Sequence, residues 1–438
     1  MLAHHALPTA DRWSHTMPSA VWIPAEWLAE FLLAIAYGAT GWGGVIFITA
    51  AAFALAIALL ATFLLRRLPP LPVAIAALAG AMLVLPHLLA RPHVLALPVL
   101  VAWCGALLAA RDDERGPPWW ALAVMMLWAN IHGSFMFGLA LAGFCACEAV
   151  LLPAAGCSRF AEAKRWGSFV AAAAVASLCN PDGLSALLQP LRLVAMPALQ
   201  SSFVEWAPAK LSEFRALEVW LLGAVALGFA LRARLPWTRL ALLLGLFYMA
   251  LAHVRHADLL GLVGPLAIAG SLGPALVSLM APAASSPVSR AAAALARPIR
   301  PPACILALCL AIVASLPALF DPPARAGDAV TPQAALDEAR RLGLTGPVFN
   351  SEAYGGFLIF SGVPVFIDGR IEMYGNDFLA AYIAAEQGEA ASLAALFARY
   401  RIAWALLQSQ SPAAAALDRM PGWRRAYADG QAIIFVPN

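Results

Sequence analysis

Arginine, histidine and carboxylate side chains gather where long apolar segments of this 438-residue chain end. Arginine suits phosphate oxygens because its guanidinium group donates two parallel hydrogen bonds, and histidine exchanges a proton near neutral pH. Ionisable groups at membrane depth are costly, so they usually pair with one another or line a polar cavity. The sequence therefore predicts a cationic pocket for a phosphate-bearing ligand, assigned to Arg91, His93, His132, Arg255 and His256. For each residue taken singly, contact with lipid headgroups or with a buried carbonyl is the alternative.

Asn130 lies two residues before His132, in the stretch Trp128-Ala129-Asn130-Ile131-His132-Gly133-Ser134. A side-chain amide there suits either the hydroxyl groups of a sugar or the carbonyl groups of a tilted backbone. We therefore predict Asn130 and His132 as residues that orient a sugar ligand, with the backbone role as the alternative.

Two carboxylates, Glu26 and Glu30, stand four residues apart near the N-terminus, among tryptophan and leucine residues. In a helix this spacing places both on one face. The segment predicts an interfacial helix that carries carboxylates towards the pocket. Glu26 and His132 are the predicted catalytic residues. Glu26 serves as a general base for an acceptor hydroxyl, and holding a divalent metal ion is its alternative role. A purely solvated face of the helix is the remaining interpretation.

Asp368 and Arg370 are separated by Gly369 and follow the predicted strand Val363-Pro364-Val365-Phe366-Ile367. Polar residues at strand ends often form binding sites, and we include both as candidate ligand contacts. Asp-Gly is equally a turn sequence, so an ion pair that stabilises the tail is the alternative.

The composition places these residues in a membrane protein, because 62% of the chain is hydrophobic and only 12% is charged. Soluble domains carry about 25% charged residues. Ten apolar segments are long enough to span a bilayer or nearly so. They are 43–65, 71–89, 93–110, 118–131, 134–152, 167–182, 217–232, 236–253, 257–280 and 303–320. We therefore predict an α-helical polytopic protein with about ten transmembrane helices.

Every second loop between these segments is basic, which by the positive-inside rule makes those loops cytoplasmic. The histidine-bearing turns then face the opposite side. This gives three parts: residues 1–40, an extracytoplasmic segment with the interfacial helix; 41–320, the transmembrane helices; and 321–438, an extracytoplasmic tail. The predicted location is a bacterial inner membrane, in contact with its lipids, and the net charge of +3 argues against a nucleic-acid partner.

The tail changes character, since its apolar runs shorten to strand length. We predict a mixed α/β domain with a helix over 331–341 capped by Thr331, further helices over 377–387 and 391–400, and strands over 346–350, 363–367, 403–407 and 432–436.

At these residues the sequence resembles bacterial polytopic proteins related to the GT-C class of glycosyltransferases, which use polyprenyl-phosphate sugars. The matching stretches are Ala25–Glu30, Arg91–His93, Trp128–Ser134, Asn180–Gly183, Glu205–Trp206, Val348–Asn350, Tyr354–Gly356, Phe366–Arg370 and Tyr374. The resemblance implies a GT-C-like bundle that transfers a sugar from a lipid-linked phosphate donor to an exported acceptor. It also implies an acid on the first outer loop and Arg or His groups on the lipid phosphate. Relatives usually begin with a further helix and an acidic, Trp-rich stretch, so we expect either a start assigned too late or an inactive copy, with Glu26 as the nearest substitute.

Two other classes of function stay open. A transporter or flippase for a lipid-linked solute predicts polar residues along the span interiors, whereas 50–60 is almost wholly apolar. A non-catalytic envelope assembly protein would use the tail as its binding module. No cofactor is assigned beyond the metal alternative.

Overall fold

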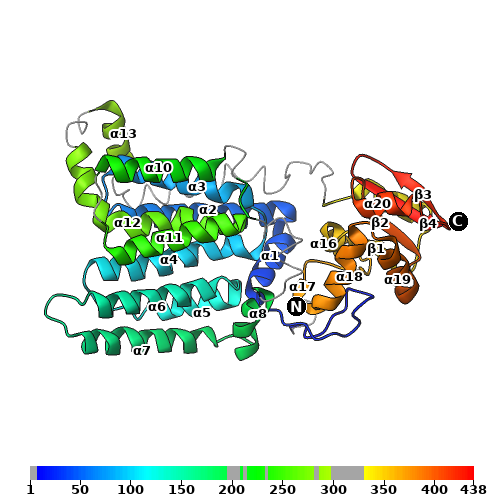
Figure 1. The fold of residues 1–438 in the computed structure, drawn as a ribbon, viewed down its shortest axis with the longest axis horizontal. Coiled ribbons are helices and arrows are strands. Elements are labelled where there is room, and N and C mark those ends of the chain that lie inside the picture. The colour runs from blue at the N-terminus through cyan, green and yellow to red at the C-terminus, as the bar shows by residue number, and fades with distance from the viewer. Residues whose placement is uncertain (1–6, 195–207, 211–214, 232–234, 281–285, 297–329) are drawn as a thin grey trace.

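The computed structural model describes residues 7–194, 208–210, 215–231, 235–280, 286–296 and 330–438. Within these ranges the chain forms a bundle of helices and a smaller C-terminal domain beyond one end of it (Figure 1). The N-terminal segment lies between the two, next to the C-terminal domain.

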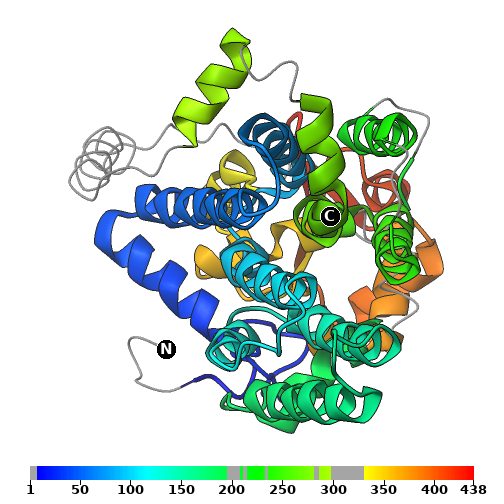
Figure 2. The ribbon, with the colours of Figure 1, turned by 90° about the vertical axis from the view of Figure 1, so that its left-hand side faces the viewer.

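The bundle is built from apolar helices that run back and forth along its length, as the view along the bundle shows (Figure 2). Its helices are α1 (Trp27–Thr40), α2 (Trp42–Leu64), α3 (Pro70–Val84), η1 (Leu85–His87), α4 (Pro92–Asp112), α5 (Ala121–Ile131), α6 (Phe135–Leu151), α7 (Arg159–Ser177), α8 (Leu184–Val194), α10 (Ala216–Leu231), α11 (Trp237–Ala252), η3 (Val254–His256), α12 (Ala257–Met280) and α13 (Pro287–Leu295). Proline begins α3 and α4, where its missing N–H costs no helix hydrogen bond. Gly41 joins α1 to α2 with a φ of 65°, which allows the sharp turn between them.

Among the residues that the structure describes, four helices are long and apolar enough to cross a membrane: Trp42–Leu64, Pro70–His87, Pro92–Asp112 and Val254–Met280. Five shorter apolar helices accompany them, which are α1, α5, α6, α10 and α11. The prediction of a membrane-helical protein is confirmed at this level, and the count of about ten spans stays a prediction. The predicted segment 303–320 lies outside the described residues.

The spans differ in how much of their surface the bundle covers. Buried positions make up 72% of the apolar window of α4 and 67% of that of α12, against 28% for α2. α4 and α12 therefore form the centre, while α2 presents most of its apolar surface outwards, as expected of a helix in contact with lipid. α3 packs closely on α12, since a Cβ on Gly80 would lie 2.7 Å from the Gly261 carbonyl oxygen.

The C-terminal domain contains a four-stranded sheet in the order β1-β2-β4-β3. Its strands are β1 (Val348–Asn350), β2 (Trp404–Gln408), β3 (Trp423–Ala428) and β4 (Ala432–Pro437), and only β1 and β2 pair in parallel. The helices are α15 (Gln333–Arg341), η5 (Glu352–Tyr354), α16 (Gly355–Phe360), α17 (Ile371–Tyr374), α18 (Asn376–Glu386), α19 (Ala390–Tyr400) and α20 (Pro412–Leu417). The predicted small α/β domain is therefore present.

Three details of the prediction were wrong. The segment 363–367 forms no strand of the sheet, because Pro364 lacks an N–H and Val365 instead pairs with Ser14 of the N-terminal segment. β3 was missed, since its alternation is weak and Arg424 and Arg425 are exposed. Thr331 is not the cap of α15, which begins at Gln333 with Pro332 in the cap position.

Candidate functional site

A cavity of about 660 Å³ lies where the bundle meets the C-terminal domain. Its walls are the segment before α1, the α3–α4, α5–α6 and α11–α12 turns, residues of α8, and the start of α17. These turns share one end of the bundle, the end nearest the C-terminal domain (Figure 1). The volume suits a ligand of the size of a sugar phosphate or larger.

The structure brings the predicted cationic residues together, since Arg91, His93, His132, Arg255 and His256 all line this cavity. They come from three turns that are far apart in the sequence. The His93 and His132 rings lie 6.2 Å apart between centroids, and His93 Nε2 lies 2.9 Å from the His87 carbonyl oxygen. That carbonyl orients the His93 ring towards the cavity wall rather than towards lipid.

Four carboxylates, Glu26, Glu30, Asp258 and Glu372, line the same cavity. Glu26 directly precedes α1, and Glu372 belongs to α17 of the C-terminal domain. Removal from bulk water raises the pKa of Glu26 to about 8, and the negative charges of Glu30 and Glu372 add to this rise. The Gly133 N–H and Arg255 oppose it. Because the Glu26 side chain is still 36% exposed, its carboxyl group is accessible from the cavity.

His132 holds Glu26 through a fixed ring orientation. The Ser134 backbone N–H donates to His132 Nδ1 at 3.1 Å, so Nδ1 carries no proton and the ring proton is on Nε2. Nε2 lies 3.3 Å from Glu26 Oε1. Burial beside His93 and Arg255 lowers the pKa of His132 to about 3, which keeps the ring neutral.

Asn130 does not line the cavity, contrary to its predicted contact with a ligand. Its Oδ1 accepts a hydrogen bond from Trp27 Nε1 at 2.7 Å, and its Nδ2 donates to the Met126 and Cys179 carbonyl oxygens. Both amide protons are therefore used within the protein. Asn130 ties the start of α1 to the ends of α5 and α7, and so fixes Glu26, the residue before Trp27.

Asp368 and Arg370 form an ion pair, with Arg370 Nη2 2.6 Å from Asp368 Oδ2. Tyr374 also donates to Asp368, which is 2% exposed. Arg370 reaches Asp11 of the N-terminal segment at 2.7 Å and stacks on Trp13, 4.9 Å from its ring centroid. The arrangement favours the structural alternative for Asp368, while Arg370 touches the cavity wall at its edge.

The N-terminal segment is bound to the C-terminal domain by further contacts. His15 Nε2 lies 2.9 Å from the Val348 carbonyl oxygen, and Thr16 donates to the Phe366 carbonyl at 2.7 Å. Backbone hydrogen bonds join Trp13 and His15 to Val365. We call residues 9–22 the N-terminal strap, because they hold the C-terminal domain next to the residue pair Glu26 and Trp27.

Sequence reasoning missed Glu372 and Gln189, which lie in this cavity and are 3.2 Å apart between Oε1 and Nε2. Burial raises the pKa of Glu372. No motif in the sequence marks either residue, because their proximity depends on how the C-terminal domain sits on the bundle. The one sequence feature that could have pointed to Glu372 as a site residue was its position two residues after Arg370, a predicted ligand contact.

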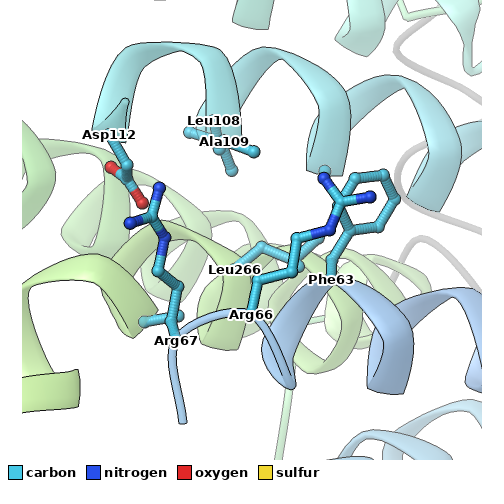
Figure 3. A pocket seen from close by; sticks show the side chains of 9 residues that line it. Phe63, Arg66, Arg67, Leu108, Ala109, Asp112 and Leu266 are labelled. Carbon is cyan, nitrogen blue, oxygen red and sulfur yellow. The ribbon is translucent and has the colours of Figure 1, made fainter. Parts of the chain in front are cut away.

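The opposite end of the bundle carries a different set of charges. Glu148 of α6, 4% exposed, lies between Arg111 of α4 and Arg239 of α11, and Arg239 also reaches Asp112 at 2.8 Å. Thr238 donates to Glu148 at 2.7 Å. Next to this network, a pocket of about 20 Å³, room for one water, is lined by Arg66, Arg67 and Asp112 (Figure 3). Two of the predicted basic turns, those that begin at Arg66 and at Arg111, thus lie together at the end remote from the histidines.

A metal centre finds no support in the ranges that the structure covers, where no three His, Cys, Asp or Glu side chains converge closely enough to hold an ion. In comparisons with known proteins, no family model matches the chain and no curated protein is significantly similar to it. The function must be argued from the cavity itself.

Proposed function

We propose that this chain is an integral membrane glycosyltransferase that moves a sugar from a lipid-linked phosphate donor to an exported acceptor. One observation supports the proposal above others: a single cavity holds a carboxyl group, Glu26, and two guanidinium groups, Arg91 and Arg255. The cavity opens at the end of the apolar bundle, where a polyprenyl chain in the bilayer would bring its phosphate.

In the proposed reaction, the Glu26 carboxylate takes the proton of the acceptor hydroxyl. The acceptor oxygen forms a bond to the anomeric carbon, and the bond from that carbon to the phosphate oxygen breaks. The electron pair leaves with the phosphate, whose charge Arg91 and Arg255 balance by charge-assisted hydrogen bonds. His256, in the same wall, completes the phosphate contact. His132, whose Nε2 lies 3.3 Å from Glu26 Oε1, keeps this carboxylate directed into the cavity.

The proposal also assigns each end of the bundle to one side of the membrane. The cavity and the C-terminal domain face the extracytoplasmic side of a bacterial inner membrane, since the basic turns gather at the other end. Asn130 and Asp368 act as structural residues in this account, because their polar atoms already bind within the protein. Arg370 holds the N-terminal strap.

The proposal is tested with the purified full chain in lipid nanodiscs and a radiolabelled polyprenyl-phosphate sugar. Glu26→Gln and Arg255→Ala should each lower transfer by at least about a hundredfold, as expected when a general base or a phosphate contact is removed. Asp377→Asn, an exposed carboxylate of the C-terminal domain, is the matched control and should keep full activity. Transfer that survives both cavity substitutions rejects the assignment.

A non-catalytic protein that binds a lipid-linked glycan for envelope assembly is the second candidate. The raised pKa of Glu26 favours it, because a carboxyl group that is largely protonated at neutral pH binds a ligand but accepts protons poorly. This candidate predicts that the donor binds, that Arg255→Ala weakens binding, and that no sugar is transferred to any acceptor.

A further inference from the structure

Three exposed aromatic side chains meet at the junction of the bundle and the C-terminal domain. Tyr37 and Trp42 lie 5.2 Å apart between ring centroids, and Phe360 lies 5.5 Å from the first and 5.4 Å from the second. They are 38%, 47% and 56% exposed, respectively. We call these three residues the aromatic patch; it joins the end of α1, the start of α2 and the end of α16.

The position of Trp42 places the patch at the edge of a membrane. Trp42 is the first residue of α2, a helix long enough to cross a bilayer, of which only 28% of the apolar window is buried in the protein. Ile46 and Phe47, one turn further on, are 48% and 41% exposed and continue the same apolar surface. Because Trp and Tyr favour the boundary between hydrocarbon and water, Trp42 and Tyr37 are suited to that depth.

Phe360 brings the C-terminal domain to this depth. It ends α16, and its ring is within 5.4 Å of the Trp42 ring, so it lies at the level where the span begins. Arg340 of α15 donates to the carbonyl oxygen of Ser361, the next residue, at 3.3 Å. Arg340 is 53% exposed and pairs also with Asp337, while Arg341 beside it pairs with Glu338. In a lipid surface a layer of phosphate groups covers the hydrocarbon layer. The apolar ring of Phe360 beside an arginine side chain matches this order of layers.

We propose that the aromatic patch, with Arg340 at its rim, is a membrane-docking surface through which the C-terminal domain rests on the lipid headgroup layer. The occupant is the lipid of the membrane that α2 crosses, because the patch continues the lipid-facing surface of that helix without a break. Phe360 enters the layer below the headgroups, and Arg340 contacts their phosphates. The docking fixes the height of the C-terminal domain above the bilayer, independently of any sugar transfer.

The test uses the full chain in nanodiscs made with radiolabelled phospholipid. A photoreactive benzoylphenylalanine replaces Phe360 in one variant and Arg424 in a second. Arg424 is also exposed to solvent but lies on β3, an edge strand of the sheet that is far from the bundle (Figure 1). After irradiation, the lipid label attached to the chain is counted for both variants.

We expect the Phe360 position to carry several-fold more cross-linked lipid than the Arg424 position, and Arg340→Gln to lower the yield at position 360 more in anionic than in zwitterionic lipid. Equal yields at the two positions overturn the proposal. So does a cross-link from position 360 that joins another protein chain and no lipid, since the surface would then be a protein interface.

Discussion

Glu26 stands in surroundings that oppose its negative charge, and this sets the pH at which it can act as a base. Its pKa is about 8 because it is withdrawn from water and faces Glu30 and Glu372, with only Arg255 and the Gly133 N–H in opposition. Since the carboxylate is the active form, the rate of transfer should rise as the pH increases from 6.5 through about 8 and then level. The rate constant in nanodiscs across that range is the measurement.

The Glu26→Gln variant should show no such rise, because an amide does not titrate. A rate in the parent protein that falls with pH, or that does not change with pH, would assign the base to another group. No transfer at any pH would favour the binding protein without catalysis.

His132 should act on the reaction through Glu26. His132→Leu removes the Nε2 that lies 3.3 Å from Glu26 Oε1, so the carboxylate loses this polar contact and its pKa should rise further. The pH profile should then move to higher pH. His132→Gln supplies an amide N–H in its place and should move the profile less. Equal profiles for the two variants would show that His132 has no positioning role.

For individual residues, the sequence predicted which side chains meet in the cavity better than it predicted what each side chain does there. The alternation of basic and non-basic loops alone placed Arg91, His132 and Arg255 on one side of the membrane. This sorting is strong because burying a charge in the bilayer is costly and because the two lipid surfaces differ in the charges they retain. The hydrogen bonds of Asn130 to backbone carbonyls were the alternative left open by the sequence, whereas its bond with Trp27 from another helix was not predictable. Glu372 was missed for the same reason: it reaches the cavity only through the docking of a separate domain.

Among the elements, the N-terminal strap depends on the ion pair of Asp11 and Arg370. Both side chains are largely buried, at 0% and 15% exposed. Asp11→Ala leaves a guanidinium group in the junction without this partner, and loss of one member of a buried pair costs about 3–5 kcal/mol. The strap should detach, and limited proteolysis should cleave within residues 9–22 many times faster.

Asp418→Ala is the matched control, because its pair with Arg425 is more exposed, at 30% and 50%. Such surface pairs contribute about 0–1 kcal/mol, so cleavage of the strap should not change. If Asp11→Ala leaves the strap as resistant as the parent chain, the ion pair does not hold it.

The helices of the bundle are joined at the other end by the network around Glu148. Glu148→Ala leaves Arg111 and Arg239 buried with one counter-charge fewer, and we expect a loss of about 3–5 kcal/mol. Heat inactivation in detergent should then begin at a clearly lower temperature. Since the network is remote from the cavity, the transfer rate per folded molecule should stay unchanged; a lowered rate at low temperature would contradict this separation.

The elements themselves were predicted where their periodicity was strong and local. Long apolar runs gave α2, α4 and α12 to within a few residues, and apolar runs of strand length gave β2 and β4. The predicted strand at Val363 to Ile367 failed because its hydrogen-bonding partner, the N-terminal strap, lies about 350 residues away in sequence. A local pattern carries no information on such a distant pairing.

For the whole molecule, the arrangement depends on which end of the bundle faces the cytosol, and two native cysteines mark the two ends. Cys157 lies in the turn between α6 and α7, and Cys179 follows α7 at the cavity end; both are exposed. Retaining one of them and changing the other six cysteines to serine gives two single-cysteine chains. In spheroplasts, a membrane-impermeant maleimide should label Cys179 directly and Cys157 only after lysis.

The physical reason is the charge sorting of the turns. Arg67 pairs with Asp113 at the end where α2 and α4 finish, and the Glu114 carboxylate binds the Ala155 N–H beside Cys157, so the basic turns form one surface. Lys and Arg are retained on the cytosolic side during insertion, which leaves the cavity outside. A permeant maleimide should label both chains equally and serves as the control. Labelling of Cys157 before lysis would invert the orientation, and the cavity would then face the cytosol, where it would meet no exported acceptor.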